Sequence, residues 1–183
     1  MMAYGIERYD FSRTDFKSME ELEGNLDGQD WPGISPFASL LMGLTIAVKA
    51  KVIFEIGTGG LWSTQCFLHG LEKTDGRIIS CDTIKRFKDF SHARLQFINK
   101  PSYEMAKNWK EPIDILFIDG DHRYEGVKQD YALFSPFTRK NELIIFHDTN
   151  HPGFPGIKKA VDEVKGLQKI VFTQFPGLIV CMK

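Results

Sequence analysis

The chain has 183 residues, of which 43% are hydrophobic and 26% are charged, enough for one domain with a sizeable buried core. Its 23 basic and 24 acidic residues give a formal net charge of -1, so no overall positive charge points to nucleic acid. No apolar run approaches the ~18 residues that span a membrane, and the cysteines show no C-x-x-C spacing. We therefore expect a soluble cytoplasmic protein that binds neither nucleic acid nor a membrane.

Glycines and prolines interrupt the polar N-terminal stretch, which carries no long hydrophobic pattern. We interpret residues 1–34 as an N-terminal helical or lid segment and residues 35–183 as the main domain. The pair Ser35-Pro36 is typical of a helix start, with serine as the N-cap. Apolar residues then follow at helical spacing, and they are Phe37, Leu40, Leu41, Leu44 and Val48.

Strand and helix patterns alternate along the rest of the chain. Strands are predicted over 51–56, 77–82, 94–98, 113–118 and 142–147. Helices are predicted over 61–73, within 84–92, and over 102–109, 124–134 and 156–165. The later strands are almost continuously apolar, which is typical of parallel strands covered by helices on both faces. This pattern predicts a doubly wound α/β sheet, and the apolar segments 169–173 and 177–181 predict an antiparallel hairpin at its end.

A glycine-rich turn, Gly57-Thr58-Gly59-Gly60, lies between the first strand and the next helix. Glycines let a backbone approach a ligand closely, and the first N–H groups of a helix lack partners. The turn is not the G-x-G-x-x-G of dinucleotide sites, because the third position after Gly59 is Trp62. Glu55 at the strand end would also repel a pyrophosphate. The turn favours a cationic or hydroxyl-bearing ligand, and S-adenosylmethionine, with its ammonium and sulfonium, fits that chemistry.

Asp82 stands at the end of the second predicted strand. An acidic residue at this place commonly accepts the ribose hydroxyls of an adenosine cofactor. The alternative interpretation is an N-cap for a helix that begins after Thr83. Both interpretations depend on the carboxylate lying at the edge of the sheet.

The strand over 113–118 is followed at once by Asp119-Gly120-Asp121-His122. Carboxylate oxygens with an imidazole suit Mg²⁺ or a similar divalent ion. His122 is alternatively a general base, because the ordinary pKa of histidine lies near the operating pH. A plain turn, with Asp121 capping the following helix, is the third interpretation.

The next strand ends in His147-Asp148. Because neighbouring parallel strands end at the same edge of a sheet, Asp119, His147 and Asp148 are expected to converge, as a metal site requires. The alternative for His147 is a buried neutral ring that is hydrogen-bonded to the backbone. Isolated charges at such ends are costly unless they are paired or used, which favours a functional site.

Together these motifs resemble class I S-adenosylmethionine-dependent methyltransferases. The similarity is to the branch with an IDGDH-x-Y-E-G-V segment and a later HD, which includes cephalosporin-hydroxylase-like and macrolide-sugar O-methyltransferase relatives. It runs from about residue 35 to the end and is carried by Glu55–Gly59, Ile118–Val127 and His147-Asp148 in the expected order. The resemblance implies a seven-stranded sheet of order 3-2-1-4-5-7-6 with an antiparallel last strand.

The resemblance also implies roles for particular residues. Glu55, Gly57 and Gly59 would hold the methionine part of the cofactor, Asp82 the ribose, and Ser102 would lie near the adenine. The full set of expected cofactor-binding residues is Glu55, Gly57, Thr58, Gly59, Gly60, Ser63, Thr64, Asp82, Ser102 and Asp119. A divalent metal ion would be held by Asp119, His147 and Asp148, and the expected catalytic residues are His122 as the base and Asp119. Relatives usually carry two acids or an Asp-Asn pair at the positions of His147 and Asp148, so His147 is a departure that either speaks against a metal or favours an ion softer than Mg²⁺.

We therefore expect transfer of a methyl group from S-adenosylmethionine to a small-molecule acceptor, at a hydroxyl oxygen such as that of a sugar or polyol. Two alternatives remain open at this stage. One is a non-catalytic S-adenosylmethionine-binding scaffold, and the other is a metal-dependent hydrolase that uses the cluster around Asp119 and His147. A homo-oligomer is compatible with the sequence.

Overall fold

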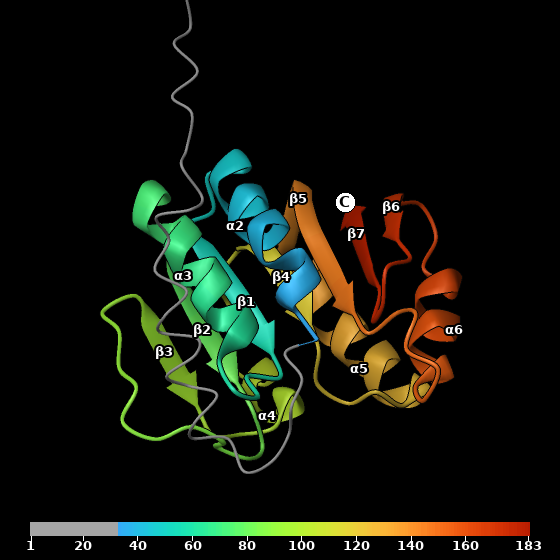
Figure 1. The fold of residues 1–183 in the computed structure, drawn as a ribbon, viewed down its shortest axis with the longest axis horizontal. Coiled ribbons are helices and arrows are strands. Elements are labelled where there is room, and N and C mark those ends of the chain that lie inside the picture. The colour runs from blue at the N-terminus through green and yellow to red at the C-terminus, as the bar shows by residue number, and fades with distance from the viewer. Residues whose placement is uncertain (1–32) are drawn as a thin grey trace, which may run out of the picture. The chain divides into compact units, whose positions relative to one another are not determined.

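The computed structural model describes residues 33–183, which form a seven-stranded sheet with the strand order β3-β2-β1-β4-β5-β7-β6 (Figure 1). The strands are β1 (Val52–Ile56), β2 (Arg77–Cys81), β3 (Leu95–Ile98), β4 (Ile113–Ile118), β5 (Thr138–His147), β6 (Gln168–Phe172) and β7 (Leu178–Met182). Strands β1 to β5 run parallel, whereas β7 is antiparallel to both β5 and β6. The predicted fold class, strand order and terminal hairpin are confirmed.

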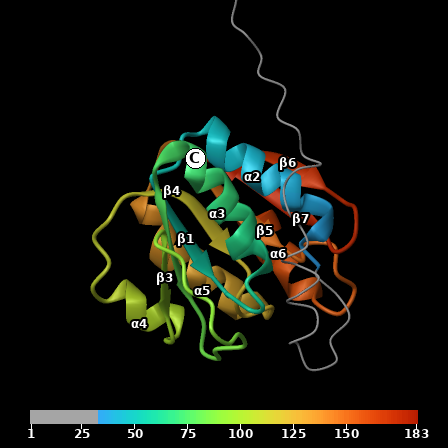
Figure 2. The same cartoon turned by 60° about the vertical axis from the view of Figure 1, so that its left-hand side comes forward.

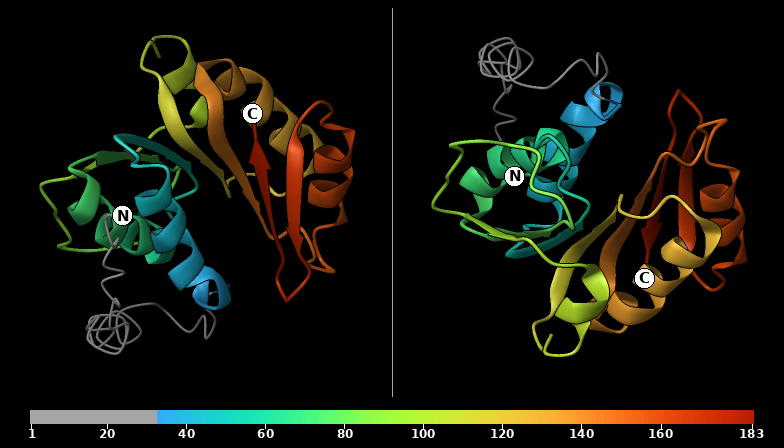
Figure 3. Two further views of the ribbon diagram at one scale, coloured as in Figure 1. Left: turned by 90° about the horizontal axis from the view of Figure 1, so that it is seen from above. Right: turned by 90° about the horizontal axis from the view of Figure 1, so that it is seen from below.

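Helices cover both faces of this sheet. They are α2 (Ala38–Ala47), α3 (Trp62–Thr74), α4 (Ser102–Ala106), α5 (Tyr124–Phe134) and α6 (Pro155–Glu163), with short 3₁₀ turns η2 (Ser35–Phe37) and η3 (Ser135–Phe137). Figure 2 shows α2 and α3 side by side, and the views along the sheet in Figure 3 place them on the face opposite α5 and α6. Among residues 33–183, no helix is both long and apolar enough to cross a bilayer.

The central strands contribute to two separate hydrophobic cores, one on each face of the sheet. Ile53 and Ile115 pack with α2 and α3, while their neighbours Phe54 and Leu116 pack with α5 and α6. All four side chains have no exposed surface. Successive side chains of a strand point to opposite faces, so a strand buried on both faces needs an unbroken apolar run. This explains why the central strands lack an alternating pattern.

Two local predictions were wrong. The helix start at Ser35 is a 3₁₀ turn whose N-cap is Ile34, without a side-chain cap, and the α-helix begins at Ala38. Between β2 and β3 the structure has no helix in the stretch 84–92. Phe87 is buried there, with its ring 4.9 Å from that of Phe97, and Asp89 has a left-handed φ of 49°. The apolar contact of Phe87 thus anchors an irregular loop rather than a helical face.

Candidate functional site

The ends of four parallel strands lie at the same edge of the sheet (Figure 1). The register pairs Ile56 with both Cys81 and Ile118, and Ile118 with Phe146. The residues that follow these four positions are Gly57, Asp82, Asp119 and His147. The structure therefore brings the strand-end residues of the sequence analysis to one edge, where ligands bind in open α/β sheets.

Glu55 is turned inward, below the glycine turn, and has no exposed surface. Its Oε1 accepts a hydrogen bond from the hydroxyl of Ser63 (2.5 Å), and its Oε2 accepts bonds from Thr64 (2.6 Å) and Ser80. The hydroxyls of Ser80 and Thr58 share a further bond of 2.6 Å. This network joins β1, β2 and the first turn of α3. Glu55, Thr58, Ser63 and Thr64 thus support the turn from within, and their direct contact with a cofactor stays a prediction.

Burial raises the pKa of Glu55 to about 7, although the three hydroxyl bonds oppose the shift. A group whose pKa is higher in the folded state loses stabilisation as the pH rises from its unfolded to its folded pKa. For Glu55 that window runs from 4.5 to about 7. We expect the free energy of unfolding of the wild type to fall, relative to Glu55→Gln, by about 3 kcal/mol between pH 4.5 and 8.

Urea unfolding of both proteins across this pH range, followed by circular dichroism, measures the difference. Glu72→Gln, which removes a carboxylate at an exposed position on the same helix α3, is the matched control. A difference between wild type and Glu55→Gln that stays constant with pH would contradict the buried network.

The glycine turn is tight on one side and open on the other. Gly57 has a φ of 92°, and a Cβ atom there would lie 2.1 Å from the backbone oxygen of Asp119. Gly59 has a φ of 51°, and a Cβ atom there would meet no described atom within 4 Å. Leu61, the N-cap of α3, also has a left-handed φ of 73°. The turn therefore passes directly over the end of β4 while leaving space beside Gly59.

Asp82 holds the open side of this turn. Its Oδ2 accepts a bond from the N–H of Gly59 (3.0 Å), and its Oδ1 accepts one from the N–H of Ile84 (3.0 Å). The interpretation of Asp82 as a helix N-cap is wrong, because no helix follows β2 before β3 begins. Its carboxylate is partly exposed beside the glycine turn, where it has lone pairs left for further donors. Ribose binding at Asp82 stays a prediction.

Ser102 is the first residue of α4, and its hydroxyl donates to the carboxylate of Asp130 on α5. Asp130 is 4% exposed, and burial raises its pKa to about 6. Sequence reasoning missed Asp130. The available signal was its place three residues after Val127, on the side of α5 that faces the core. A role of Ser102 near an adenine stays a prediction.

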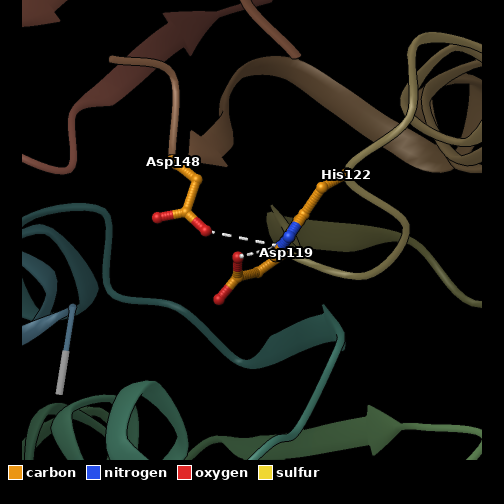
Figure 4. A group of neighbouring side chains, drawn as sticks. All are labelled: Asp119, His122 and Asp148. Atoms are coloured by element: carbon orange, nitrogen blue, oxygen red, sulfur yellow. Dashed lines mark ion pairs between the residues drawn. The ribbon is translucent and has the colours of Figure 1, made fainter. Parts of the chain in front are cut away.

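A polar cluster of Asp119, His122, His147 and Asp148 occupies the ends of β4 and β5. His122 lies in the loop before α5, and Asp148 has a left-handed φ of 56° directly after β5. Figure 4 shows the side chains of Asp119, His122 and Asp148 pointing toward one another. The Nε2 of His122 lies 3.4 Å from Oδ1 of Asp119 and 3.4 Å from Oδ2 of Asp148. The expected convergence of Asp119, His147 and Asp148 is present, and His122 joins it.

His147 is buried and engaged on both sides of its ring. Its Nδ1 lies 3.1 Å from Oδ1 of Asp119 and 3.3 Å from Oδ1 of Asp148, and its Nε2 lies 3.3 Å from the backbone oxygen of Gly33. Burial disfavours the charged ring, but Asp119 and Asp148 outweigh it and raise the pKa of His147 to about 9. The ring is thus buried and bonded to the backbone, as the alternative above expects, while the two carboxylates at its other nitrogen favour the protonated form over the neutral one.

The two carboxylates and the two imidazole rings of the cluster shift one another's pKa values. Burial raises the pKa of Asp119, but the adjacent His147 and His122 outweigh this and hold it below its usual range. Burial also lowers the pKa of His122, but Asp119 and Asp148 raise it above its ordinary value. The pKa of Asp148 is raised, mainly by burial. These four groups are strongly coupled, so they act as one unit rather than as separate acids and bases.

An aromatic row extends outward from His122. The ring of Phe154 lies 4.3 Å from that of His122 and 4.3 Å from that of His151, and His151 lies 5.2 Å from Phe175. The sequence did not indicate that Phe154 touches the ring of His122.

A family model described as a methyltransferase domain matches residues 54–149, which run from β1 to just past Asp148. A curated relative, an uncharacterized protein of Acanthamoeba polyphaga mimivirus, is 33% identical over 78 residues, covering 39% of this chain and 35% of that protein. The chain thus matches about a third of that relative's length.

Solved structures share the fold at low sequence identity. A cofactor-bound protein from MTB is 18% identical with a TM-score of 0.74, covering 91% of this chain and 89% of that one. An O-methyltransferase from Bacillus cereus in complex with SAH is 18% identical with a TM-score of 0.65, covering 98% and 94%. The O-methyltransferase TomG of Streptomyces achromogenes, in complex with SAM, is 15% identical with a TM-score of 0.61, covering 98% and 99%.

Proposed function

Since the chain belongs to the methyltransferase domain family, we propose that it transfers a methyl group from S-adenosylmethionine to a hydroxyl oxygen of a small molecule. The oxygen forms a bond to the methyl carbon while the carbon–sulfur bond breaks. The sulfonium becomes a neutral thioether, and the hydroxyl proton passes to a base or to water. Because the methyl group is already activated, the main task of the protein is to hold the two reacting atoms in line.

The contact between the glycine turn and the polar cluster carries this proposal. Gly57 lies against the backbone of Asp119. A cofactor whose amino-acid end rests on the turn would therefore have its methyl group within reach of Asp119, His122 and Asp148. Both halves of the reaction, a cofactor and an acceptor hydroxyl, can then meet at one point of the strand edge. A protein that only binds the cofactor would not need a site for an acceptor hydroxyl beside it.

Four features of this edge of the sheet support S-adenosylmethionine as the cofactor. The space beside Gly59 admits a ligand, and the first N–H groups of α3 are available to its carboxylate. Asp82 offers its remaining lone pairs to ribose hydroxyls at the same turn. The carboxylates of Asp119 and Asp148 favour the ammonium and sulfonium charges beside them.

The acceptor is expected on the side of His122 and Phe154. His122 and two carboxylates provide polar partners for a hydroxyl group, and the ring of Phe154 provides an apolar surface against the body of the acceptor. This combination suits a small molecule that carries a hydroxyl group on an apolar or ring-shaped frame.

Asp82→Asn is expected to weaken S-adenosylmethionine binding about 10- to 100-fold, because hydrogen bonds to a charged group contribute about 1.5–3 kcal/mol. One amide oxygen remains to accept from Gly59, so the turn should persist. Isothermal titration calorimetry measures the affinity. Asp89→Asn, at an exposed left-handed position in the same loop, is the control and should bind as the wild type does. Equal affinity of the Asp82→Asn variant would remove the ribose assignment.

The activity itself is tested by incubating the protein with methyl-labelled S-adenosylmethionine and a fractionated metabolite extract. We expect labelled product in the fractions that contain hydroxyl compounds, together with one S-adenosylhomocysteine per methyl group transferred. Cofactor binding without any labelled product would instead favour the scaffold alternative.

A further inference from the structure

The hydroxyl of Ser102 and the carboxylate of Asp130 join α4 to α5 at the edge of the sheet that carries the glycine turn. Ser102, the first residue of α4, donates a hydrogen bond to Oδ1 of Asp130. The Oδ2 of Asp130 lies 3.5 Å from the point that a Cβ atom of Gly120 would occupy, just past the end of β4. Figure 1 shows α4 at the lower edge of the sheet, toward which the arrowheads of β1 and β3 point. The pair therefore borders the edge where the cofactor is expected.

Backbone and side-chain bonds connect the start of α4 to Asp82. The N–H of Asp82 donates to the carbonyl of Ile98 at the end of β3 (3.3 Å), and the side-chain amide of Asn99 donates to the carbonyl of Asp82 (2.8 Å). Ser102 follows Asn99 by three residues, so their Cα atoms are at most about 11 Å apart. A base attached to a ribose at Asp82 is therefore within reach of Ser102.

The carboxylate of Asp130 determines the direction of the Ser102 hydroxyl. An ionised carboxylate only accepts hydrogen bonds, so the hydroxyl donates its single proton to it. The oxygen of Ser102 then keeps its lone pairs but has no proton for another partner. Ser102 is partly exposed, whereas Asp130 is 4% exposed, so the serine is the member of the pair that a ligand can reach. The pair thus offers a ligand a hydrogen-bond acceptor and not a donor.

A purely structural role explains the buried charge of Asp130 less well. Burying a carboxylate is costly, and burial raises the pKa of Asp130 to about 6. The contact between the two helices does not need this charge, because Met105 and Ala106 of α4 already pack against the apolar core that includes Val127 of α5. A charge that is kept at the edge of the sheet despite its cost favours a role in ligand recognition.

We propose that Ser102 accepts a hydrogen bond from the 6-amino group of the cofactor's adenine and that Asp130 is the positioning residue that makes Ser102 an acceptor. The proposal rests on the proposed function, because it takes the bound nucleoside to be that of S-adenosylmethionine. A base with an oxygen at this position, such as hypoxanthine, would place one acceptor against another and leave both without a donor. The site therefore selects a base that carries an amino group over one that carries an oxygen.

The test compares S-adenosylhomocysteine with S-inosylhomocysteine, in which hypoxanthine replaces adenine. Isothermal titration calorimetry at pH 8, where the Asp130 carboxylate is ionised, measures both affinities. We expect the wild type to bind the adenine ligand at least about tenfold more tightly than the hypoxanthine ligand. Ser102→Ala should lower this ratio at least about fivefold, because the acceptor is gone. A ratio that is the same in Ser102→Ala and in the wild type would overturn the proposal.

Asp130→Asn separates a role in selectivity from one in fastening α4 to α5. The amide can donate to Ser102, which frees the hydroxyl proton for the oxygen of hypoxanthine. We expect the ratio to fall at least about fivefold, mainly through tighter binding of S-inosylhomocysteine. If Asp130 only fastened the two helices, both ligands would weaken alike, and this unchanged ratio would overturn the proposal. Glu125→Gln, at an exposed position on α5, is the control and should keep the wild-type ratio. Melting curves show whether each variant is folded.

The failure of this proposal and the failure of the proposed function give different results. Binding of S-adenosylhomocysteine with a ratio that neither variant changes would refute the role of Ser102 and Asp130 and leave methyl transfer intact. A wild-type protein that binds neither ligand at millimolar concentration would refute the proposed function as well.

Discussion

Gly57→Ala is expected to destabilise the domain by about 3–5 kcal/mol and to lower its melting temperature by about 10 °C. A Cβ atom at this position would lie 2.1 Å from the carbonyl oxygen and 2.5 Å from the carbonyl carbon of Asp119. Both are backbone atoms at the end of the central strand β4, so neither can move aside cheaply. The left-handed φ of 92° adds strain for any residue other than glycine.

Gly59→Ala is the matched control for this prediction. No described atom lies within 4 Å of the point that its methyl group would occupy, and its φ of 51° costs alanine only about 1 kcal/mol. We expect this variant to fold with a small loss of stability but to bind S-adenosylmethionine more weakly, because the methyl group enters the ligand space. Differential scanning calorimetry measures both variants. Equal melting temperatures for the two would contradict the close approach of Gly57 to Asp119.

Asp119→Asn is expected to reduce methyl transfer at least about 100-fold, because its carboxylate contacts both histidines of the cluster. The amide keeps the size of the side chain but removes its charge. The buried cation of His147 then faces Asp148 alone, and we expect a loss of up to about 3 kcal/mol in the free energy of unfolding. Initial rates with labelled cofactor, together with urea unfolding, measure the two effects.

Asp121→Asn is the matched control for Asp119→Asn. This neighbouring carboxylate is bonded to the exposed side chain of Arg123 and lies outside the cluster. An exposed ion pair of this kind contributes little to the free energy of unfolding, so the loss of the Asp121 charge should leave activity and stability nearly unchanged. If both variants lost activity to the same extent, the effect of Asp119 would not be specific to the cluster.

The fold was predictable because its evidence is spread over the whole chain. Mostly apolar runs such as 113–118 are typical of strands that are buried on both faces, and the short spacing between 169–173 and 177–181 fits a hairpin. The helix predicted within 84–92 was wrong because the evidence for it was confined to one short segment. That segment is short and its structure depends on the packing of Phe87 against Phe97, which a local pattern does not contain.

The sequence also located the site, because parallel strands place their end residues at one edge of the sheet. It could not determine the direction of individual side chains. Glu55 turns into the core instead of toward the edge, because three hydroxyl donors surround it there. The orientation of the His147 ring likewise depends on the Gly33 carbonyl, which is 114 residues away from His147 along the chain.

A crystal structure of the protein with S-adenosylhomocysteine tests the central claim most directly. We expect the ribose hydroxyls to lie within hydrogen-bond distance of Asp82 and the amino-acid end to rest on the turn from Gly57 to Gly60. The sulfur should face the cluster of Asp119, His122 and Asp148. A nucleoside bound elsewhere, or a sulfur that faces away from this cluster, would contradict methyl transfer at the strand edge.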